Sequence, residues 1–325
     1  MQLQALGSSD LNVTRIGYGC MSLGGSWEST PLNEITRKEA VKSIRSALDE
    51  GINFFDHADI YTRGKSEEAF SAIWADAPRL REQIYLQTKC GIRFHGDPNL
   101  NSPDRYDFSY DHIMDSVHGS LHRLKTDYLD VLLLHRPDPL VEPEEVAHAF
   151  DDLYRSGKVR YFGVSNHTAA QIELLQKYLH QPVITNQVEF NLIHTHLLDE
   201  GIMFNQNSAL LTRNEGTIEY CRLHNITLQA WSPLARGRLT SDQVETPTES
   251  FSEAAKMVAQ MAQEKGVSPE AILIAWILRH PAYIQPIIGS TNPMRIKAAC
   301  QGDGVLLNRD EWYRLFRAGR GEDLP

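Results

Sequence analysis

The 325-residue chain is 42% hydrophobic and 23% charged, a composition typical of a folded protein that buries a large core rather than of a disordered one. Its 32 basic and 42 acidic side chains give a formal net charge of -10, which excludes a uniformly basic surface for nucleic acid or anionic lipid. Its longest apolar runs fall far short of the ~20 residues that span a bilayer, and its four cysteines are too widely spaced for a disulfide scaffold or a zinc site.

The chain opens with two short apolar segments, 3–6 and 13–16, separated by residues that favour turns. These segments predict a β-hairpin that serves as a lid or a plug. Short apolar runs typical of buried strands then recur along the chain, at 16–20, 52–55, 84–89, 129–134, 159–164, 183–188, 227–231 and 284–288.

Segments with a helical spacing of apolar residues lie between these strands. One apolar face, from Ala40 to Leu48, stops at Gly51, and a second, from Val146 to Leu153, stops before Gly157. Thr168 is a candidate N-cap for a third helix, and residues 309–318 predict an amphipathic closing helix. Repeated strand–helix units require right-handed crossovers. Eight of them favour an α/β protein with a (β/α)8 TIM barrel, an N-terminal β-hairpin and a C-terminal helical tail, as a single domain over residues 1–325.

A doubly wound open sheet is the alternative fold. The segment Gly17-Tyr18-Gly19-Cys20-Met21-Ser22 follows the first barrel strand and nearly matches the dinucleotide-binding glycine pattern. The match fails at its third glycine, and residues 23–31 do not open a helix whose N-terminus could bind phosphate. The barrel is therefore the better prediction.

Polar residues gather at the carboxyl ends of the predicted strands. A single one of them is usually a turn or cap former, but a barrel brings all these ends to one mouth, where active sites are built. The residues in question are Asp56, Lys89, His135, Ser165, Asn166, Asn186, Gln187, Trp231, Ser232 and Ser290.

Four residues of this group and its neighbouring loop form a set that can donate a proton to a buried oxygen. We expect the Lys89 ammonium to lower the pKa of the Tyr61 phenol from about 10 toward neutrality. Asp56 would offset the cost of burying the lysine charge. A neutral His135 imidazole would orient the substrate oxygen through a hydrogen bond.

These residues resemble the catalytic tetrad of the aldo-keto reductase superfamily, in particular of its bacterial NADP-dependent oxidoreductases. The segment 53–61 resembles the family segment in which an aspartate precedes the acid tyrosine by five residues. Thr88-Lys89-Cys90 resembles the lysine strand, and 127–135 resembles the histidine strand. The later strands are similar at 157–166, 186–190, 231–237 and 286–291, so the resemblance covers about residues 3 to 300 in the family's order.

The resemblance implies a cytoplasmic, NADP-dependent aldo-keto reductase that transfers a hydride to an aldehyde or ketone, with Tyr61 as general acid. It implies NADPH/NADP+ rather than NADH as cofactor, and a small carbonyl compound as substrate. The charge and the short apolar runs argue against a nucleic acid or membrane partner, and Ser165 and Asn166 at the end of the fifth strand argue against a metal site. A monomer or small homo-oligomer is expected. The catalytic residues that the resemblance implies are Asp56, Tyr61, Lys89 and His135. The cofactor-binding residues that it implies are Gly19, Cys20, Met21, Asp56, Ser165, Asn166, Gln187, Trp231, Ser232, Pro233, Leu234, Arg236, Gly237, Gly289, Ser290, Thr291 and Arg295.

Individual roles follow from the same resemblance. Ser165, Asn166 and Gln187 would hold the nicotinamide carboxamide, and Trp231 would stack on the ring. Residues 232–237 would wrap the pyrophosphate. Ser290 and Arg295 would hold the adenosine 2′-phosphate. Many family members carry a basic residue where Gly289 stands here, so a strict preference for NADPH over NADH is not implied.

Two other functions fit parts of the sequence. The segment 56–59 and the pair His194 and His196 could contribute to a metal site in a barrel hydrolase. A catalytically weak NADPH sensor or regulatory subunit would have the same fold, because fold does not fix function. Substrate choice is expected to lie in the loops, including Trp27 and a surface excursion at 93–107.

Overall fold

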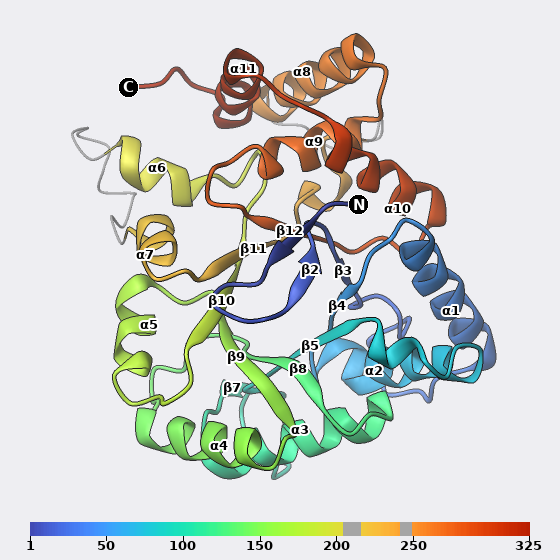
Figure 1. Ribbon diagram of the computed structural model, residues 1–325, viewed down its shortest axis with the longest axis vertical. Coiled ribbons are helices and arrows are strands. Elements are labelled where there is room, and N and C mark those ends of the chain that lie inside the picture. Colours follow the sequence, from blue (N-terminus) through green and yellow to red (C-terminus); the bar gives the residue numbers. More distant parts are fainter. Residues whose placement is uncertain (204–215, 241–248) are drawn as a thin grey trace.

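A computed structural model describes residues 1–203, 216–240 and 249–325. Eight parallel strands form a closed barrel, in which β12 pairs with β3 and completes the ring (Figure 1). The predicted (β/α)8 barrel is therefore confirmed. The barrel strands are β3 (Gly17–Gly19), β4 (Phe54–Asp56), β5 (Tyr85–Cys90), β8 (Leu129–Leu134), β9 (Val159–Ser165), β10 (Val183–Glu189), β11 (Thr227–Trp231) and β12 (Gln285–Ile288).

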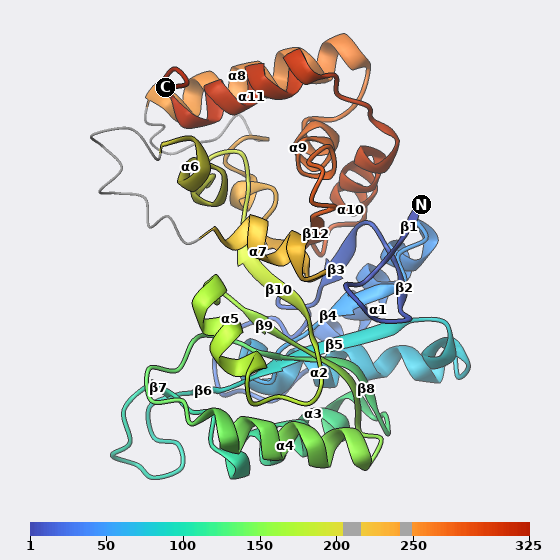
Figure 2. The same ribbon diagram turned by 60° about the vertical axis from the view of Figure 1, so that its left-hand side comes forward.

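Helices cover the outside of the barrel (Figures 1 and 2). The α-helices are α1 (Glu34–Asp49), α2 (Lys65–Phe70), α3 (Tyr110–Leu124), α4 (Pro143–Arg155), α5 (Ala169–Gln176), α6 (His196–Ile202), α7 (Thr217–Leu223), α8 (Glu249–Lys265), α9 (Pro269–Leu278), α10 (Pro293–Cys300) and α11 (Arg309–Arg320). Short 3-10 helices are η1 (Tyr61–Gly64), η2 (Ser71–Ala75), η3 (Leu80–Glu82), η5 (Ala235–Gly237) and η6 (Gln301–Gly304). None of the helices in the described ranges is both long and apolar enough to cross a membrane.

Local sequence signals explain where several helices begin and end. The Thr168 hydroxyl accepts a hydrogen bond from the Gln171 backbone N–H, and the Gln171 side-chain oxygen accepts one from the Thr168 backbone N–H, so α5 starts with a capping box. α4 starts at Pro143, whose missing N–H costs nothing in the first turn. α1 ends just before Gly51, which has a φ of +85° that other residues rarely adopt.

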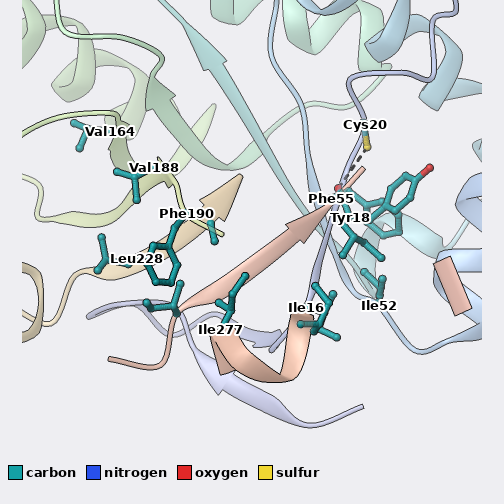
Figure 3. Close-up of a cluster of buried hydrophobic side chains, with 14 of the residues drawn as sticks. Ile16, Tyr18, Cys20, Ile52, Phe55, Val164, Val188, Phe190, Leu228 and Ile277 are labelled. Atoms are coloured by element: carbon teal, nitrogen blue, oxygen red, sulfur yellow. Dashed lines mark hydrogen bonds between the residues drawn. The ribbon is translucent and has the colours of Figure 1, made fainter. Parts of the chain in front are cut away.

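The larger of two hydrophobic cores fills the space between the outer face of the barrel and the helices. It contains Tyr18 of β3, Phe55 of β4, Leu228 of β11 and Ile277 of α9, all nearly or fully buried (Figure 3). The C-terminal helix α11 packs along α8 beyond α9 (Figure 2). The predicted helical tail therefore completes the outer layer of the fold.

The smaller core lies inside the barrel, under the N-terminal hairpin of β1 (Leu3–Ala5) and β2 (Asn12–Thr14). The hairpin lies across the centre of the ring in Figure 1. It inserts Leu6, Leu11 and Val13 against inward-facing apolar side chains of the barrel such as Phe54 and Val131. Of the two roles expected for the hairpin, the structure shows the plug.

The segment after β5 forms a small antiparallel sheet of β6 (Ile92–Arg93) and β7 (Arg105–Tyr106). It occupies the stretch that the sequence predicts as a surface excursion. The ring of Trp27 contacts Phe94 edge to face, with centroids 6.5 Å apart. This contact connects the loop after β3 with the loop after β5.

Replacing Leu11 by alanine tests the plug. Leu11 is 1% exposed, so the Leu11→Ala variant should lose about 2–5 kcal/mol of unfolding free energy, measured by urea denaturation. Leu3 lies in the same hairpin but is 52% exposed, so Leu3→Ala should change the unfolding free energy by less than about 0.5 kcal/mol. Equal losses in the two variants would contradict the plug.

Candidate active site

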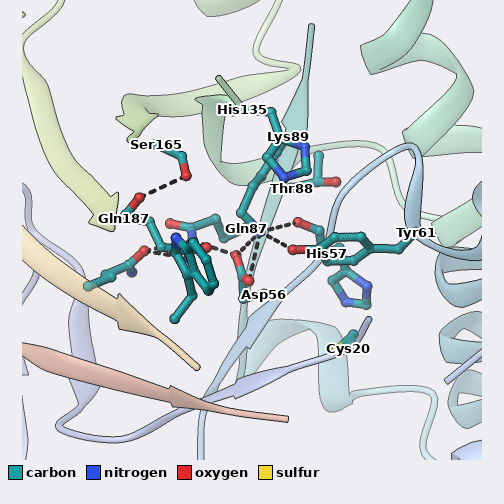
Figure 4. A network of polar contacts seen from close by, with 12 residues as sticks. Cys20, Asp56, His57, Tyr61, Gln87, Thr88, Lys89, His135, Ser165 and Gln187 are labelled. Carbon is teal, nitrogen blue, oxygen red and sulfur yellow. Dashed lines mark hydrogen bonds and ion pairs between the residues drawn. The ribbon is translucent and has the colours of Figure 1, made fainter. Parts of the chain in front are cut away.

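Four side chains meet at the carboxyl ends of neighbouring strands, as the sequence predicts (Figure 4). Asp56 ends β4, Lys89 lies near the end of β5, and His135 directly follows β8. Tyr61 begins η1, in the loop after β4. The rings of Tyr61 and His135 meet edge to face with centroids 5.8 Å apart.

The ammonium of Lys89 is fully buried and uses its hydrogen-bonding capacity within this group. Its Nζ lies 2.7 and 2.8 Å from the two carboxylate oxygens of Asp56 and 2.8 Å from the backbone oxygen of His57. It also lies 3.0 Å from the Tyr61 hydroxyl oxygen. An ammonium only donates hydrogen bonds, so the Tyr61 oxygen is the acceptor and its own proton remains available.

Burial, rather than Lys89, decides whether the pKa of Tyr61 is raised or lowered. Burial raises the pKa of the Tyr61 phenol above its ordinary value, and the Lys89 ammonium lowers it only in part. The expectation of a lowered pKa is therefore wrong for this structure. Burial also acts to lower the pKa of Lys89, but Asp56 and Tyr61 outweigh it and hold the lysine charged.

His135 is held in its neutral form. Burial, followed by the charges of Lys89 and Arg136, brings the pKa of the imidazole well below its ordinary value. Its Nδ1 is buried and has no hydrogen-bond partner among the described residues. A neutral imidazole at this position can donate one hydrogen bond to an oxygen in the cavity.

A chain of buried glutamines inside the barrel supports the aspartate. The Gln87 side-chain nitrogen donates to Asp56, at 2.7 Å, and to Gln229, at 2.8 Å. Gln229 also accepts from Gln187, at 3.1 Å, and donates to Gln285, at 2.9 Å. Gln285 in turn donates to a backbone carbonyl of β2, so the chain connects the hairpin plug to Asp56.

The sequence reasoning missed this chain, although a signal was present. Side chains two apart on a strand share a face. Gln87 is two residues before Lys89, and Gln229 is two residues before Trp231. Gln87 therefore lies on the same strand face as Lys89, and Gln229 on the same face as Trp231, so both glutamine amides could be expected inside the barrel below the site.

A cavity of about 790 Å³ opens beside the tetrad. All the predicted cofactor-binding residues line it except Cys20, which is fully buried, and Thr291, which is exposed. Tyr61 and His135 also line the cavity, whereas Lys89 lies behind them. The lining residues that the sequence reasoning did not single out for the site are Ser22, Arg136, Thr240, Glu270 and Ile287.

The end of the cavity nearest the tetrad is organised by side-chain amides and hydroxyls. The Ser165 hydroxyl donates to the Gln187 backbone oxygen at 2.8 Å, and Asn166 donates to the Ser165 hydroxyl oxygen at 2.7 Å. The Trp231 indole N–H donates to the Asn166 side-chain oxygen at 3.0 Å. These contacts fix the orientations of the Ser165, Asn166 and Trp231 side chains. Because the Gln187 nitrogen is engaged by Gln229, its amide oxygen is left to accept from a carboxamide.

A bulge in β10 decides which residue of that strand faces the cavity. The pairing between β10 and β9 shifts register between Val183 and Asn186. As a result Gln187 lines the cavity, while the Asn186 side chain donates to the His167 backbone oxygen at 2.8 Å. The bulge thus places Gln187 in the site, where strict alternation from the buried Ile184 would place Asn186.

The other end of the cavity has the features of an anion site. The loop after β11 contributes Ser232 and Arg236, and the segment after β12 contributes Ser290 and Arg295. Ser232 and Arg236 have φ values of +52° and +57°, a backbone conformation that is costly outside glycine and concentrates at functional sites. Two guanidinium groups and two hydroxyls suit the phosphates of a dinucleotide.

The residues that suggested a metal site are not gathered into one within the described part of the chain. His57 is fully buried, and neither ring nitrogen has a hydrogen-bond partner in the described part of the chain. The rings of His194 and His196 lie against each other beyond β10, with centroids 4.5 Å apart. Within residues 1–203, 216–240 and 249–325, no group of three or more His, Cys, Asp or Glu side chains could hold a metal ion.

Comparison with known proteins gives a consistent result. The family model described as the Aldo/keto reductase family matches residues 15–315. The oxidoreductase YcsN of Bacillus subtilis is 38% identical over 327 residues, which cover 98% of each protein. A protein of Agrobacterium fabrum named 6-dehydroglucose reductase is 34% identical over 325 residues, which cover 100% of both. The structure of a glycerol dehydrogenase from Gluconobacter oxydans matches 98% of this chain and 94% of that one with a TM-score of 0.81, and at 24% identity this shows the shared fold.

The buried, unbonded imidazole of His57 predicts a pH-dependent stability. Burial and the nearby Lys89 charge lower its pKa to about 3, so below pH 6.5 the unfolded chain binds a proton that the folded chain does not. Between pH 7 and pH 5 this group alone should remove about 2 kcal/mol of unfolding free energy. The His57→Leu variant should lose that part of the pH dependence, and it leaves no buried hydrogen bond unmade at pH 7.

Urea unfolding at pH 7, 6 and 5 measures this effect. The matched control is His95→Gln, because His95 is exposed and its side chain makes no ion pair or ring contact with a described residue, so the variant should keep the wild-type loss of stability toward pH 5. An identical loss of stability toward pH 5 in wild type and His57→Leu would reject the assignment.

Proposed function

The chain belongs to the aldo/keto reductase family of oxidoreductases, and from this premise we propose that it reduces an aldehyde or ketone to the alcohol with NADPH. The observation that carries the proposal is the arrangement around Lys89. The lysine donates to the Tyr61 oxygen, so the tyrosine holds its proton facing the cavity rather than sharing it with the lysine. A relative that shares 34% identity over its whole length is named a 6-dehydroglucose reductase, which supports the reductive direction.

Each member of the tetrad would have a separate role in the reduction. Tyr61 would donate its proton to the carbonyl oxygen as that oxygen becomes negative. The Lys89 ammonium, held by Asp56, would then stabilise the phenolate that remains. His135, neutral and at the edge of the Tyr61 ring, would hold the carbonyl oxygen by a hydrogen bond. These contacts fix the position of the reacting carbonyl before any bond changes.

The cavity supports NADPH as the partner of this reaction. Bound there, NADPH would supply the hydride to the carbonyl carbon. Ser165, Asn166 and Gln187 would hold its carboxamide, and Trp231 offers an aromatic face for the nicotinamide ring. At the far end, Arg295 would pair with the 2′-phosphate that distinguishes NADPH from NADH.

Removing the tyrosine hydroxyl tests the proton donor. The Tyr61→Phe variant should lower kcat/KM for a simple aldehyde by about 10²–10⁴-fold, the usual contribution of a general acid. Its NADPH dissociation constant, measured by fluorescence, should change by less than about threefold, because the hydroxyl faces the substrate end of the cavity. Tyr154→Phe is the matched control, since Tyr154 is 54% exposed on α4 and should keep full activity. Wild-type turnover in Tyr61→Phe would rule out the assignment, and NADPH binding without any turnover in the wild type would favour a sensor.

The raised pKa of Tyr61 predicts that the rate of reduction is independent of pH over a range in which the rate of alcohol oxidation rises. Reduction needs the protonated phenol, so its rate should not fall between pH 6 and pH 9, because the pKa of Tyr61 lies above the ordinary value of about 10. Alcohol oxidation needs the phenolate, so its rate should rise with pH through the same range. Steady-state rates in both directions measure this. A reduction rate that halves near pH 7 would show that the lysine outweighs burial after all.

A further inference from the structure

None of the three guanidinium groups that line the catalytic cavity, those of Arg136, Arg236 and Arg295, has a hydrogen bond or ion pair to a described residue. Arg136 directly follows His135 and is half-buried at the end of β8. Its Cζ lies 5.5 Å from the centroid of the Trp231 ring, which is a cation–π contact. The charge of Arg136 therefore faces the reacting end of the cavity without a carboxylate to neutralise it.

The other cations that surround the cavity have evident uses. Lys89 is neutralised by Asp56. Arg236 and Arg295 lie with the serines at the far end, where the proposed function places the phosphates of NADPH. This leaves Arg136 as a cation at the carbonyl end that neither the tetrad nor the cofactor accounts for, in the part of the chain that the structure describes.

Resting on the proposed reductase function, we propose that Arg136 binds the carboxylate of the substrate, and that the preferred substrates are aldehydes or ketones that carry such a group. A guanidinium presents two parallel N–H groups that match a carboxylate, and such charge-assisted pairs are stronger than neutral hydrogen bonds. A half-buried charge without a counterion is also costly to keep, so an anionic ligand gains from filling that position.

The structure leaves room for a substrate that reaches from the tetrad to Arg136 and beyond. Arg136, Asn166 and Trp231 form a shared wall between the catalytic cavity and a second cavity of about 760 Å³. A carbonyl held at Tyr61 and a carboxylate held at Arg136 would therefore lie along one continuous surface. The aromatic face of Trp231 borders the same path.

A purely structural role for Arg136 makes a different prediction. If the guanidinium only steadied the Trp231 ring, its removal would weaken NADPH binding and slow charged and neutral substrates alike. If Arg136 binds a carboxylate, its removal should lower kcat/KM for charged substrates and leave kcat/KM for neutral ones nearly unchanged. Pairs of substrates that differ only in charge separate the two roles.

The experiment compares kcat/KM for succinic semialdehyde with methyl 4-oxobutanoate, and for 4-carboxybenzaldehyde with methyl 4-formylbenzoate. In each pair the ester removes the charge and retains the aldehyde. Wild-type enzyme should favour the carboxylates by at least about tenfold, the scale of one charge-assisted hydrogen bond, and added salt should reduce this preference. Arg136→Met should abolish the preference while it changes the ester rates and the NADPH dissociation constant by less than about threefold. Arg136→Lys should restore part of it, since the charge is kept and the bidentate geometry is lost.

Arg295→Met is the contrasting variant. It should weaken NADPH binding and leave the ratio of acid to ester rates at the wild-type value, because it removes a cation from the other end of the cavity. Equal rates for acid and ester in the wild type, or an equal loss of both in Arg136→Met, would overturn the proposal. If the protein reduces none of the four aldehydes, the proposed function fails. The carboxylate site is then judged by benzoate binding to the NADPH-loaded protein, which Arg136→Met should reduce at least about tenfold and which methyl benzoate should not match.

Discussion

The buried ammonium of Lys89 is the constraint on which the rest of the site depends. A charge at 0% exposure is stable only if acceptors satisfy it, and these come from Asp56, the His57 backbone and Tyr61, all on or just after β4. Lys89 lies on β5, so β4 and β5 must stay in the register that pairs Asp56 with Gln87. A reactive phenol is thus positioned by the same contacts that make the buried charge tolerable.

The barrel interior is divided between two kinds of packing along the same strands. On β4, Phe54 faces the apolar plug of the hairpin, and Asp56, two residues later, faces the polar end. The glutamine chain lies between the two regions, and its amides bond mainly to one another, although the Gln87 side-chain oxygen is buried with no partner among the described residues. A water-filled or purely apolar interior would give Asp56 no such partner, so the rigidity of the site derives from the middle of the barrel as much as from its mouth.

Sequence patterns were sufficient for the parts of the structure that depend on periodicity and spacing. Short apolar runs predicted the eight strands, and the polar residues at their carboxyl ends predicted the tetrad. Most of the cavity lining was predicted by the resemblance to the family. Sequence patterns could not give the bulge in β10 that turns Gln187 rather than Asn186 inward, because a bulge is a property of the pairing between strands. They also misjudged the Tyr61 pKa, since a nearby lysine can be inferred from spacing but the depth of burial that opposes it cannot.

The charge of the whole chain and the charge of the cavity have opposite signs, and only the second governs what binds there. The formal net charge is -10, yet the cavity is lined by three arginines, Arg136, Arg236 and Arg295, and by two carboxylates, Asp56 and Glu270, of which Asp56 is neutralised by Lys89. At physiological ionic strength exposed charges are screened beyond about 8 Å, so the acidic surface does little to repel an anion that has entered the groove. Partly buried guanidinium groups are screened much less, and their positions at the two ends of the cavity matter more than their number. Charge at the two ends of the cavity would then reinforce the contacts of the amides, Trp231 and His135, with the phosphates of a dinucleotide at one end, the carboxylate of a substrate at the other, and the nicotinamide and the carbonyl brought together between them.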